Sequence, residues 1–162
     1  MAHPPTSPAG VNPDQALIHR FLTQPDTPLA IDSNPMARAL GMRLLHADTQ
    51  GRVTLAFDPD PLFIQGTDVL QGGAVAAMLD FAMAFATMAA LPVGWSCGTV
   101  NLNTSFQRAA PRGAYMAEGV VERCGRSLAF THARLQRADD AGHVVASASS
   151  TLALLAPRTG RP

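Results

Sequence analysis

The fold is decided by residues 72–90, which read Gly72-Gly73-Ala74-Val75-Ala76-Ala77-Met78-Leu79-Asp80-Phe81-Ala82-Met83-Ala84-Phe85-Ala86-Thr87-Met88-Ala89-Ala90. Because the run is apolar on nearly every side, no amphipathic face can be assigned to it. A helix that is hydrophobic all round is normally enclosed by other elements. The stretch therefore predicts a long and fully buried helix.

A membrane span is the competing interpretation of the same stretch, because about 20 apolar residues cross a bilayer. Against it, the run is dominated by Ala, carries Asp80 near its middle and has no flanking Lys or Arg. It also lies between segments that resemble the strands of a soluble domain. We expect a core helix and no membrane association.

Segments on both sides of the helix predict β-strands. Upstream, residues 42–47 and 52–57 flank a turn at residues 48–51, which indicates a hairpin. Downstream, the candidate strands are residues 99–106, 115–121, 127–136 and 143–155, and their spacings favour antiparallel hairpins over crossovers. The predicted fold class is α+β, with an antiparallel sheet of five or six strands wrapped around one long central helix.

The strand at residues 99–106 alternates between apolar and polar side chains. Because successive side chains of a strand point to opposite faces, the pattern predicts two sets. One face is expected to carry Val100, Leu102 and Phe106, and the other Thr99, Asn101, Asn103 and Ser105.

The N-terminal part of the chain predicts a helical extension to this domain. Residues 1–12 are rich in Pro, Ser and Gly and are expected to be a disordered tail. Asn12 or Asp14 can cap a helix that runs to Gln24, and residues 35–40 predict a further helical turn stopped by Gly41. We assign residues 13–40 to the extension, 41–156 to the main domain and 157–162 to a C-terminal tail.

Composition excludes several classes of function. The 162 residues suit one domain, and Lys plus Arg balance Asp plus Glu at 12 each, so no basic surface for nucleic acid is expected. The five His residues lack metal-ligand spacing, and both Cys97 and Cys124 are interpreted as packed thiols. The first residues do not resemble a signal peptide, which favours a cytoplasmic location.

Asp80 is the only charged side chain between Asp68 and Arg108. A carboxylate in apolar surroundings must be hydrogen-bonded, protonated or open to a cleft, because burial without compensation is costly. Two interpretations remain. Asp80 is either a structural group satisfied by neighbouring donors or a catalytic carboxylate facing a pocket, where perturbed carboxylates tend to occur.

The start of the helix favours the catalytic interpretation. Its first backbone N–H groups, at Gly72 and Gly73, are free to bind a carbonyl oxygen, and glycine allows close approach. Asp80 lies eight residues later, about 12 Å along the same helix. One protomer cannot bring both groups to one carbon atom, so the spacing favours a two-fold dimer in which each subunit supplies one of them.

Three ordered segments resemble hotdog-fold acyl-CoA thioesterases. They are residues 69–80, similar to the helix signature His-Gly-Gly with an acidic residue seven positions later, residues 99–106 followed by 110–113, and residues 125–130. The motifs most resemble those of the phenylacetate-pathway and 4-hydroxybenzoyl-CoA thioesterase branch. The resemblance implies a hotdog fold, a dimer with paired sheets that often forms a dimer of dimers, and hydrolysis of an acyl-CoA at the dimer interface. It implies no cofactor, because coenzyme A is part of the substrate.

The resemblance also implies roles for individual residues. Asp80 is expected to act as general base or nucleophile, the Gly72 N–H to polarise the carbonyl, and Gln65 and Thr99 to place substrate or water. The expected substrate contacts are Gln71, Gly73, Phe81, Met83, Asn101, Gly125, Arg126 and Ser127. Among these, Phe81 and Met83 are candidates for the acyl pocket, and Arg126 suits a CoA phosphate. Arg108 and Arg112 are either solvated strand-end charges or part of the nucleotide contact.

One departure from the signature concerns Gln71, which stands where relatives have His. Gln exchanges hydrogen bonds but carries no charge near neutral pH. It can replace a His that only orients the substrate but not one that transfers a proton. A non-catalytic acyl-CoA-binding domain is therefore the alternative function, whereas a hotdog dehydratase is disfavoured because it needs a His near the carboxylate.

Overall fold

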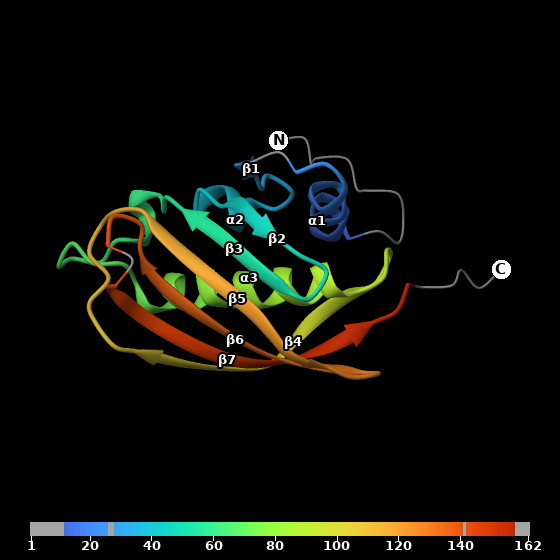
Figure 1. The fold of residues 1–162 in the computed structure, drawn as a ribbon. Coiled ribbons are helices and arrows are strands. Elements are labelled where there is room, and N and C mark those ends of the chain that lie inside the picture. The colour runs from blue at the N-terminus through green and yellow to red at the C-terminus, as the bar shows by residue number, and fades with distance from the viewer. Residues whose placement is uncertain (1–11, 26–27, 141, 158–162) are drawn as a thin grey trace.

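The computed structural model describes residues 12–25, 28–140 and 142–157 (Figure 1). The predicted tails at 1–12 and 157–162 lie outside these ranges except for Asn12 and Pro157. The helices and strands, in chain order, are α1 (Pro13–Thr23), β1 (Leu29–Ala30), α2 (Pro35–Ala39), β2 (Arg43–Ala47), β3 (Arg52–Phe57), a 3-10 turn η1 (Pro61–Phe63), α3 (Gly72–Ala90), β4 (Ser96–Phe106), β5 (Tyr115–Cys124), β6 (Leu128–Arg137) and β7 (Val144–Leu155).

The strands form one antiparallel sheet in the order β1-β2-β3-β5-β6-β7-β4. The sheet curves around α3, which lies along its inner face (Figure 1). The predicted α+β architecture of a sheet wrapped around one long helix is confirmed, and the helix has the predicted bounds. The sheet has seven strands, because the two-residue β1 extends it beyond the five or six expected.

The helix α3 packs very close to the middle of the sheet at Gly119 of β5. A Cβ atom added at Gly119 would collide with the carbonyl of Ala82, so only glycine fits between helix and strand. Around this contact, large side chains such as Met78, Leu79 and Phe85 are fully buried. The sheet and the helix therefore share one core.

The prediction that α3 is fully buried is wrong for one face. Gly73 is exposed, and Ala77, Asp80 and Ala84 are only partly buried. These positions are three or four residues apart, so they form one stripe along the helix, which we call the open face of α3. Among the described residues, α3 is the one helix long and apolar enough to cross a membrane, but 61% of its most apolar window is buried inside the protein.

The connectivity differs in part from the predicted hairpins. The hairpins β2–β3, β5–β6 and β6–β7 are confirmed, but β4 pairs with β7 instead of its sequence neighbour β5. The chain crosses over after α3, so β4 ends the sheet order, and its outer edge is free of any other strand among the described residues. Val100 and Phe106 on this edge strand are 61% and 57% exposed.

A β-bulge overturns the predicted faces of β4. Thr99 pairs with Leu152 and Asn101 with Thr151, so Val100 is the extra residue between two registers. Because one extra residue reverses the alternation, Thr99 faces α3 together with Leu102, not outward with Asn101. The sequence pattern, which is continuous across residue 100, carries no sign of this shift.

Of the N-terminal extension, α1 packs near the end of α3, where the chain continues to β4 (Figure 1), and β1 pairs with β2. Asn12 caps α1 through a 2.9 Å hydrogen bond from the backbone N–H of Asp14, which confirms one of the two predicted caps. The helical turn α2 is followed, as predicted, by Gly41 with a left-handed φ of 58°. On its inner side α1 buries Gln15, Ile18 and Phe21.

Candidate functional site

Asp80 lies on the open face of α3 and is partly exposed. The Thr99 hydroxyl donates a 2.8 Å hydrogen bond to its Oδ1 atom. The second carboxylate oxygen, Oδ2, has no hydrogen-bond partner in the part of the chain that the structure describes. Asp80 is therefore both hydrogen-bonded to a neighbour and accessible to a ligand. The sequence had left hydrogen bonding and access to a cleft as alternatives.

Cys97, two residues before Thr99 on β4, also lies near Asp80. Its thiol contacts the carbonyl oxygen of Ala84 at 3.6 Å. Burial, and to a smaller extent the charge of Asp80, raises the pKa of Cys97 to about 12. The thiol therefore stays protonated near neutral pH and is a poor nucleophile. The interpretation of a packed thiol holds for Cys97 but is wrong for Cys124, which is exposed.

The start of α3 is the second polar element on this side of the molecule. Gly72 and Gly73 are exposed, and neither backbone N–H has a hydrogen-bond acceptor among the described residues. The positive end of the helix dipole lies at the same place. The side chain of Phe106 from β4 covers one side of Gly72, 3.4 Å from the position that a Cβ would take. This terminus can accept a carbonyl oxygen.

Backbone contacts hold the segment before α3 in place. The N–H of Gln71 donates to the carbonyl of Phe63 at 2.8 Å, and that of Leu70 donates to the carbonyl of Ala110 at 2.7 Å. Ala110 belongs to the loop between β4 and β5. The loop before α3 is thus tied to a second loop at the end of the sheet.

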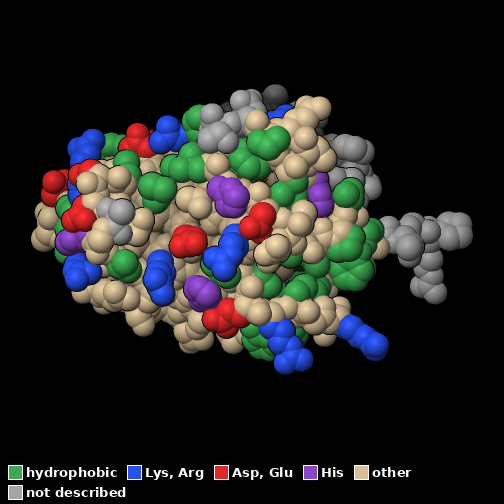
Figure 2. Space-filling model, viewed as in Figure 1, with side chains coloured by type: hydrophobic (Ala, Val, Ile, Leu, Met, Phe, Trp, Pro, Cys, Tyr) green, Lys and Arg blue, Asp and Glu red, His purple; other side chains and the backbone are tan. Residues whose placement is uncertain are grey.

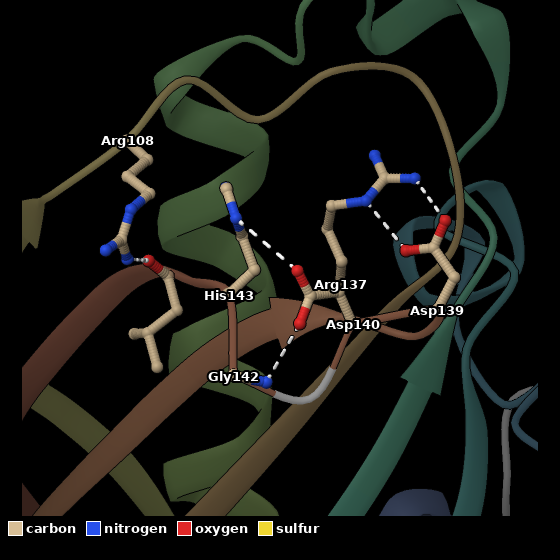
Figure 3. A network of polar contacts seen from close by, with 7 residues as sticks. Arg108, Arg137, Asp139, Asp140, Gly142 and His143 are labelled. Atoms are coloured by element: carbon tan, nitrogen blue, oxygen red, sulfur yellow. Dashed lines mark hydrogen bonds and ion pairs between the residues drawn. The ribbon is translucent and has the colours of Figure 1, made fainter.

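A polar network fixes that end of the sheet (Figure 3). The Arg108 guanidinium donates to the carbonyl of Val144 at 2.7 Å, and Arg137 binds Asp139 through two hydrogen bonds of 2.7 and 2.6 Å. The bonds from Arg137 lower the pKa of the Asp139 carboxyl. Arg108 therefore serves the strand end, which was one of its two predicted roles.

The predicted catalytic residues fall into two groups within one protomer. Gly72 and Gln71 lie at the start of α3 and Gln65 in the loop before it, while Asp80, with Thr99 of β4 bonded to it, lies about two turns further along the helix. Gln71 is exposed, and its side chain makes no capping hydrogen bond. The geometry agrees with the spacing argument that one protomer does not bring both groups together.

The two predicted acyl-pocket residues differ in their surroundings. Phe81 is partly exposed beside Asp80 and packs edge-on against Phe85, with ring centroids 6.3 Å apart. Met83 is fully buried in the core and does not reach the open face. Of this pair, only Phe81 has exposed surface that a ligand can touch.

The remaining predicted substrate contacts lie away from Asp80. Asn101 is tied to β7, since its Oδ1 accepts a 3.0 Å hydrogen bond from the backbone N–H of Thr151. Gly125, Arg126 and Ser127 form the exposed tip of the β5–β6 hairpin, where the Ser127 carbonyl accepts a 2.8 Å bond from Leu154. No ion pair holds Arg126 among the described residues.

The outer face of the sheet offers no strongly charged surface. Figure 2 shows positive, negative and His side chains interspersed over it. Two examples are Arg52 with Glu118, at 4.0 Å, and His132 with Glu122, at 2.9 Å. A hollow of about 360 Å³ lies on this face between Asn103, His132 and Ser149, on the far side of the sheet from α3. Its lining does not include Asp80, so it is separate from the candidate site.

The part of the chain that the structure describes offers no set of metal ligands. The described residues contain no group of three or more His, Cys, Asp and Glu side chains that could hold a metal ion. The chemistry that the site offers is a partly exposed carboxylate and, at the helix start, two unpaired N–H donors. A carboxylate and an oxyanion-binding helix start suit acyl transfer to water.

Comparisons with known proteins agree with this chemistry. The family model of the thioesterase superfamily matches residues 68–142. A crystal structure of a candidate thioesterase from Ralstonia eutropha, described as phenylacetic acid degradation-related, is 29% identical, with a TM-score of 0.71 over 84% of this chain and 98% of that one. A candidate esterase from Mycobacterium tuberculosis is 27% identical, with a TM-score of 0.69 over 80% and 100% of the two chains.

A more distant neighbour shares the fold alone. It comes from Streptococcus mutans, was solved bound to acetyl-CoA and is 13% identical, with a TM-score of 0.64 over 73% of this chain and 91% of that one. No curated protein matches the chain significantly in sequence. The predicted resemblance and the hotdog fold are confirmed.

Proposed function

Because this chain has a hotdog fold and matches the thioesterase superfamily over residues 68–142, we propose that it hydrolyses an acyl-CoA thioester to the free acid and coenzyme A. Asp80 is the catalytic carboxylate, and the Gly72 N–H of the partner subunit polarises the thioester carbonyl. The acyl group is aromatic or of medium length. One observation carries the proposal: Asp80 stands on the open face of α3 with a single fixed hydrogen bond, from Thr99.

The edge of β4 supports the proposal of a dimer with a site divided in this way. The free edge of β4 presents unpaired backbone groups, which favour pairing with a second strand. The open face of α3 borders the same strand, through the contact between Asp80 and Thr99. Joining two copies along β4 would cover both features and bring each Asp80 towards the partner's α3. A dimer of dimers is compatible with this arrangement.

Two routes use the same carboxylate. As a general base, Asp80 takes a proton from water, whose oxygen attacks the thioester carbon. As a nucleophile, Asp80 forms a mixed anhydride, which water then hydrolyses. In both routes the C–S bond breaks and the departing thiolate leaves as coenzyme A after gaining a proton. The carbonyl oxygen becomes negative in the transition state, where an N–H donor stabilises it most.

The substrate class is supported by the chemistry near Asp80. Phe81, the residue after Asp80 on α3, offers a partly exposed aromatic ring, which suits an apolar acyl group. The acetyl-CoA bound by the structural neighbour from Streptococcus mutans is compatible with a CoA ester as ligand of this fold. The exposed Arg126 is the candidate contact for a phosphate of coenzyme A.

A thiol-release assay over a panel of acyl-CoAs tests the proposal, with Asp80→Asn beside the unchanged protein. Asn has nearly the same shape but is neither a base nor a nucleophile, so turnover should fall at least about a hundredfold. Binding of the acyl-CoA, measured by calorimetry, should persist. Equal rates for the two proteins would reject the role of Asp80.

An acyl-CoA-binding domain without catalysis is the second candidate, and Gln71 is the observation that favours it. Gln replaces the His of the signature, and its side chain makes no capping bond. If proton transfer needed a group at this position, the protein would bind acyl-CoA without turning it over. Binding by calorimetry with no thiol release over the whole panel would favour this function.

A further inference from the structure

Two registers compete for the first half of β4. The alternation of Thr99, Val100 and Asn101 predicts an unbulged strand, with Val100 inward and Thr99 outward. The structure instead has the bulge at Val100, with Thr99 on Asp80 and Cys97 against Ala84. In the unbulged register both Thr99 and Cys97 would turn to the outer face, because each would shift by one residue. The hydrophobic pattern alone favours the wrong register.

Within the sheet, two bonds from β7 hold the C-terminal side of the bulge. The Oδ1 of Asn101 accepts a 3.0 Å hydrogen bond from the Thr151 N–H, and the Asn101 carbonyl accepts a 2.7 Å hydrogen bond from the Ser150 hydroxyl. Residues 96–99 precede the bulge, and in the bulged register they turn a hydroxyl and a thiol inward, whereas the unbulged one would bury Val100. A contact on the N-terminal side of the bulge is therefore expected to help hold these residues.

Such a contact comes from α1. The buried Gln15 donates through Nε2 to the carbonyl of Pro92 at 2.9 Å, and its Oε1 accepts the N–H of Gly94 at 2.8 Å. Asn12 donates through Nδ2 to the hydroxyl of Ser96, the first residue of β4, at 2.8 Å. These three bonds fix the turn that leads into the strand, three residues before Thr99.

We propose that α1, through Gln15 and Asn12, selects the bulged register of β4 and so places the Thr99 hydroxyl on Asp80. Gln15 and Asn12 are then positioning residues that act from a helix outside the main domain. A slip by one residue would require the turn at Pro92 and Gly94 to move, which would break both bonds of Gln15. The part that concerns activity rests on the proposed function, whereas the part that concerns register does not.

The side chain of Cys97 reports the register without any assay of hydrolysis. In a Cys124→Ser background Cys97 is the only thiol of the chain. Alkylation by iodoacetamide should be slow there, and Gln15→Ala should accelerate it at least about tenfold, since an outward thiol is solvated and ionises more easily. Ser33→Ala is the matched control. It removes the hydrogen bond from Ser33 to Asp14 of α1 without touching the turn, and should leave the rate unchanged.

Deletion of Val100 should reverse the effect of Gln15→Ala on the alkylation of Cys97. Both halves of β4 keep their partners on β7 when the extra residue is removed, and Thr99 then faces inward without a bulge. Combined with Gln15→Ala, the deletion should restore slow alkylation of Cys97. If thiol release is detectable, kcat should fall in Gln15→Ala with KM nearly unchanged, and should recover in the same combination.

The outcomes separate this inference from the proposed function. Unchanged alkylation in Gln15→Ala, or fast alkylation that the deletion of Val100 does not slow, overturns the selection of register even if Asp80 proves essential. Absence of hydrolysis in the unchanged protein counts against the proposed function and leaves the alkylation result valid. Should Gln15→Ala fail to fold, Ser96→Ala removes the bond from Asn12 and leaves the Asn12 cap of α1 in place, and an unchanged Cys97 rate in that variant overturns the inference.

Discussion

The Thr99 hydroxyl donates a 2.8 Å hydrogen bond to Asp80, although the two residues are 19 positions apart in the chain. The bond links the edge strand β4 to the middle of α3. It orients one carboxylate oxygen and leaves the other open to a ligand. The position of Asp80 therefore depends on the register of β4 as well as on its own helix.

Removing this hydrogen bond should reduce turnover. Thr99→Val keeps the shape of the side chain but has no donor, so the carboxylate loses its orientation and kcat should fall about tenfold. Thr99→Ser retains the hydroxyl and should stay within a fewfold of the unchanged protein. Steady-state kinetics on the best acyl-CoA of the panel measure both variants. A Val variant as active as the Ser variant would show that this bond has no part in the reaction.

The helix start can be tested with a proline. Gly72 is the first residue of α3, a position that tolerates proline, and Gln71 before it has the extended backbone that proline requires, with φ −58° and ψ 137°. Gly72→Pro removes one N–H while keeping the helix, and should lower kcat by about 10²–10³, as for the loss of an oxyanion-hole donor. Gly72→Ala, which retains the N–H, is the control. Similar rates for the two variants would exclude this donor from the site.

A site shared between subunits predicts complementation. Asp80→Asn and Gly72→Pro subunits, each inactive alone, should form mixed dimers in which one of the two sites is intact. Random association gives about a quarter of the unchanged activity. Subunits are mixed by co-expression, and the mixed species is confirmed by native mass spectrometry. No recovery in verified mixed dimers would place both groups in one protomer.

The two cysteines should differ in reactivity. Cys124 is exposed, whereas burial and the nearby Asp80 raise the pKa of Cys97 to about 12. A thiol reagent at pH 8 should label Cys124 first, as peptide mass spectrometry would show. Because the folded state favours the protonated thiol, its contribution to stability is complete below pH 9 and is lost as the pH rises from 9 towards about 12. The alkaline loss of stability should be shallower in Cys97→Ala, and an identical pH dependence would contradict this.

The contact between α3 and β5 should tolerate no added methyl group. In Gly119→Ala the new Cβ would collide with the backbone of Ala82, so helix and strand must separate. The free energy of unfolding should fall by about 1–3 kcal/mol, measured by urea denaturation. Gly73→Ala adds a methyl group where no atom lies within 4 Å and should change stability far less. Equal stability of the two variants would mean that the sheet can move away from α3 at Gly119 without lowering the free energy of unfolding.

Much of the site could be read from residue types near one another in sequence. The bounds of α3, the strand segments, the cap at Asn12 and the importance of Asp80 all follow from local patterns. The presence of Phe106 beside Gly72 and of Cys97 beside Asp80 does not, because each pair joins distant segments. The spacings predict the hairpins β2–β3, β5–β6 and β6–β7, but none of them indicates that β4 pairs with β7.

By itself, the sequence determined that a long apolar helix must be enclosed by antiparallel strands and that one charge within it needs a partner. It could do so because hydrophobic periodicity and the cost of burying charge act over a few residues. Only the tertiary structure decided that β4 lies at the edge beside β7, that α3 keeps an open face and that the bulge at Val100 turns Thr99 towards Asp80. These features depend on contacts between segments far apart in the chain, and for β4 they outweigh the local alternation.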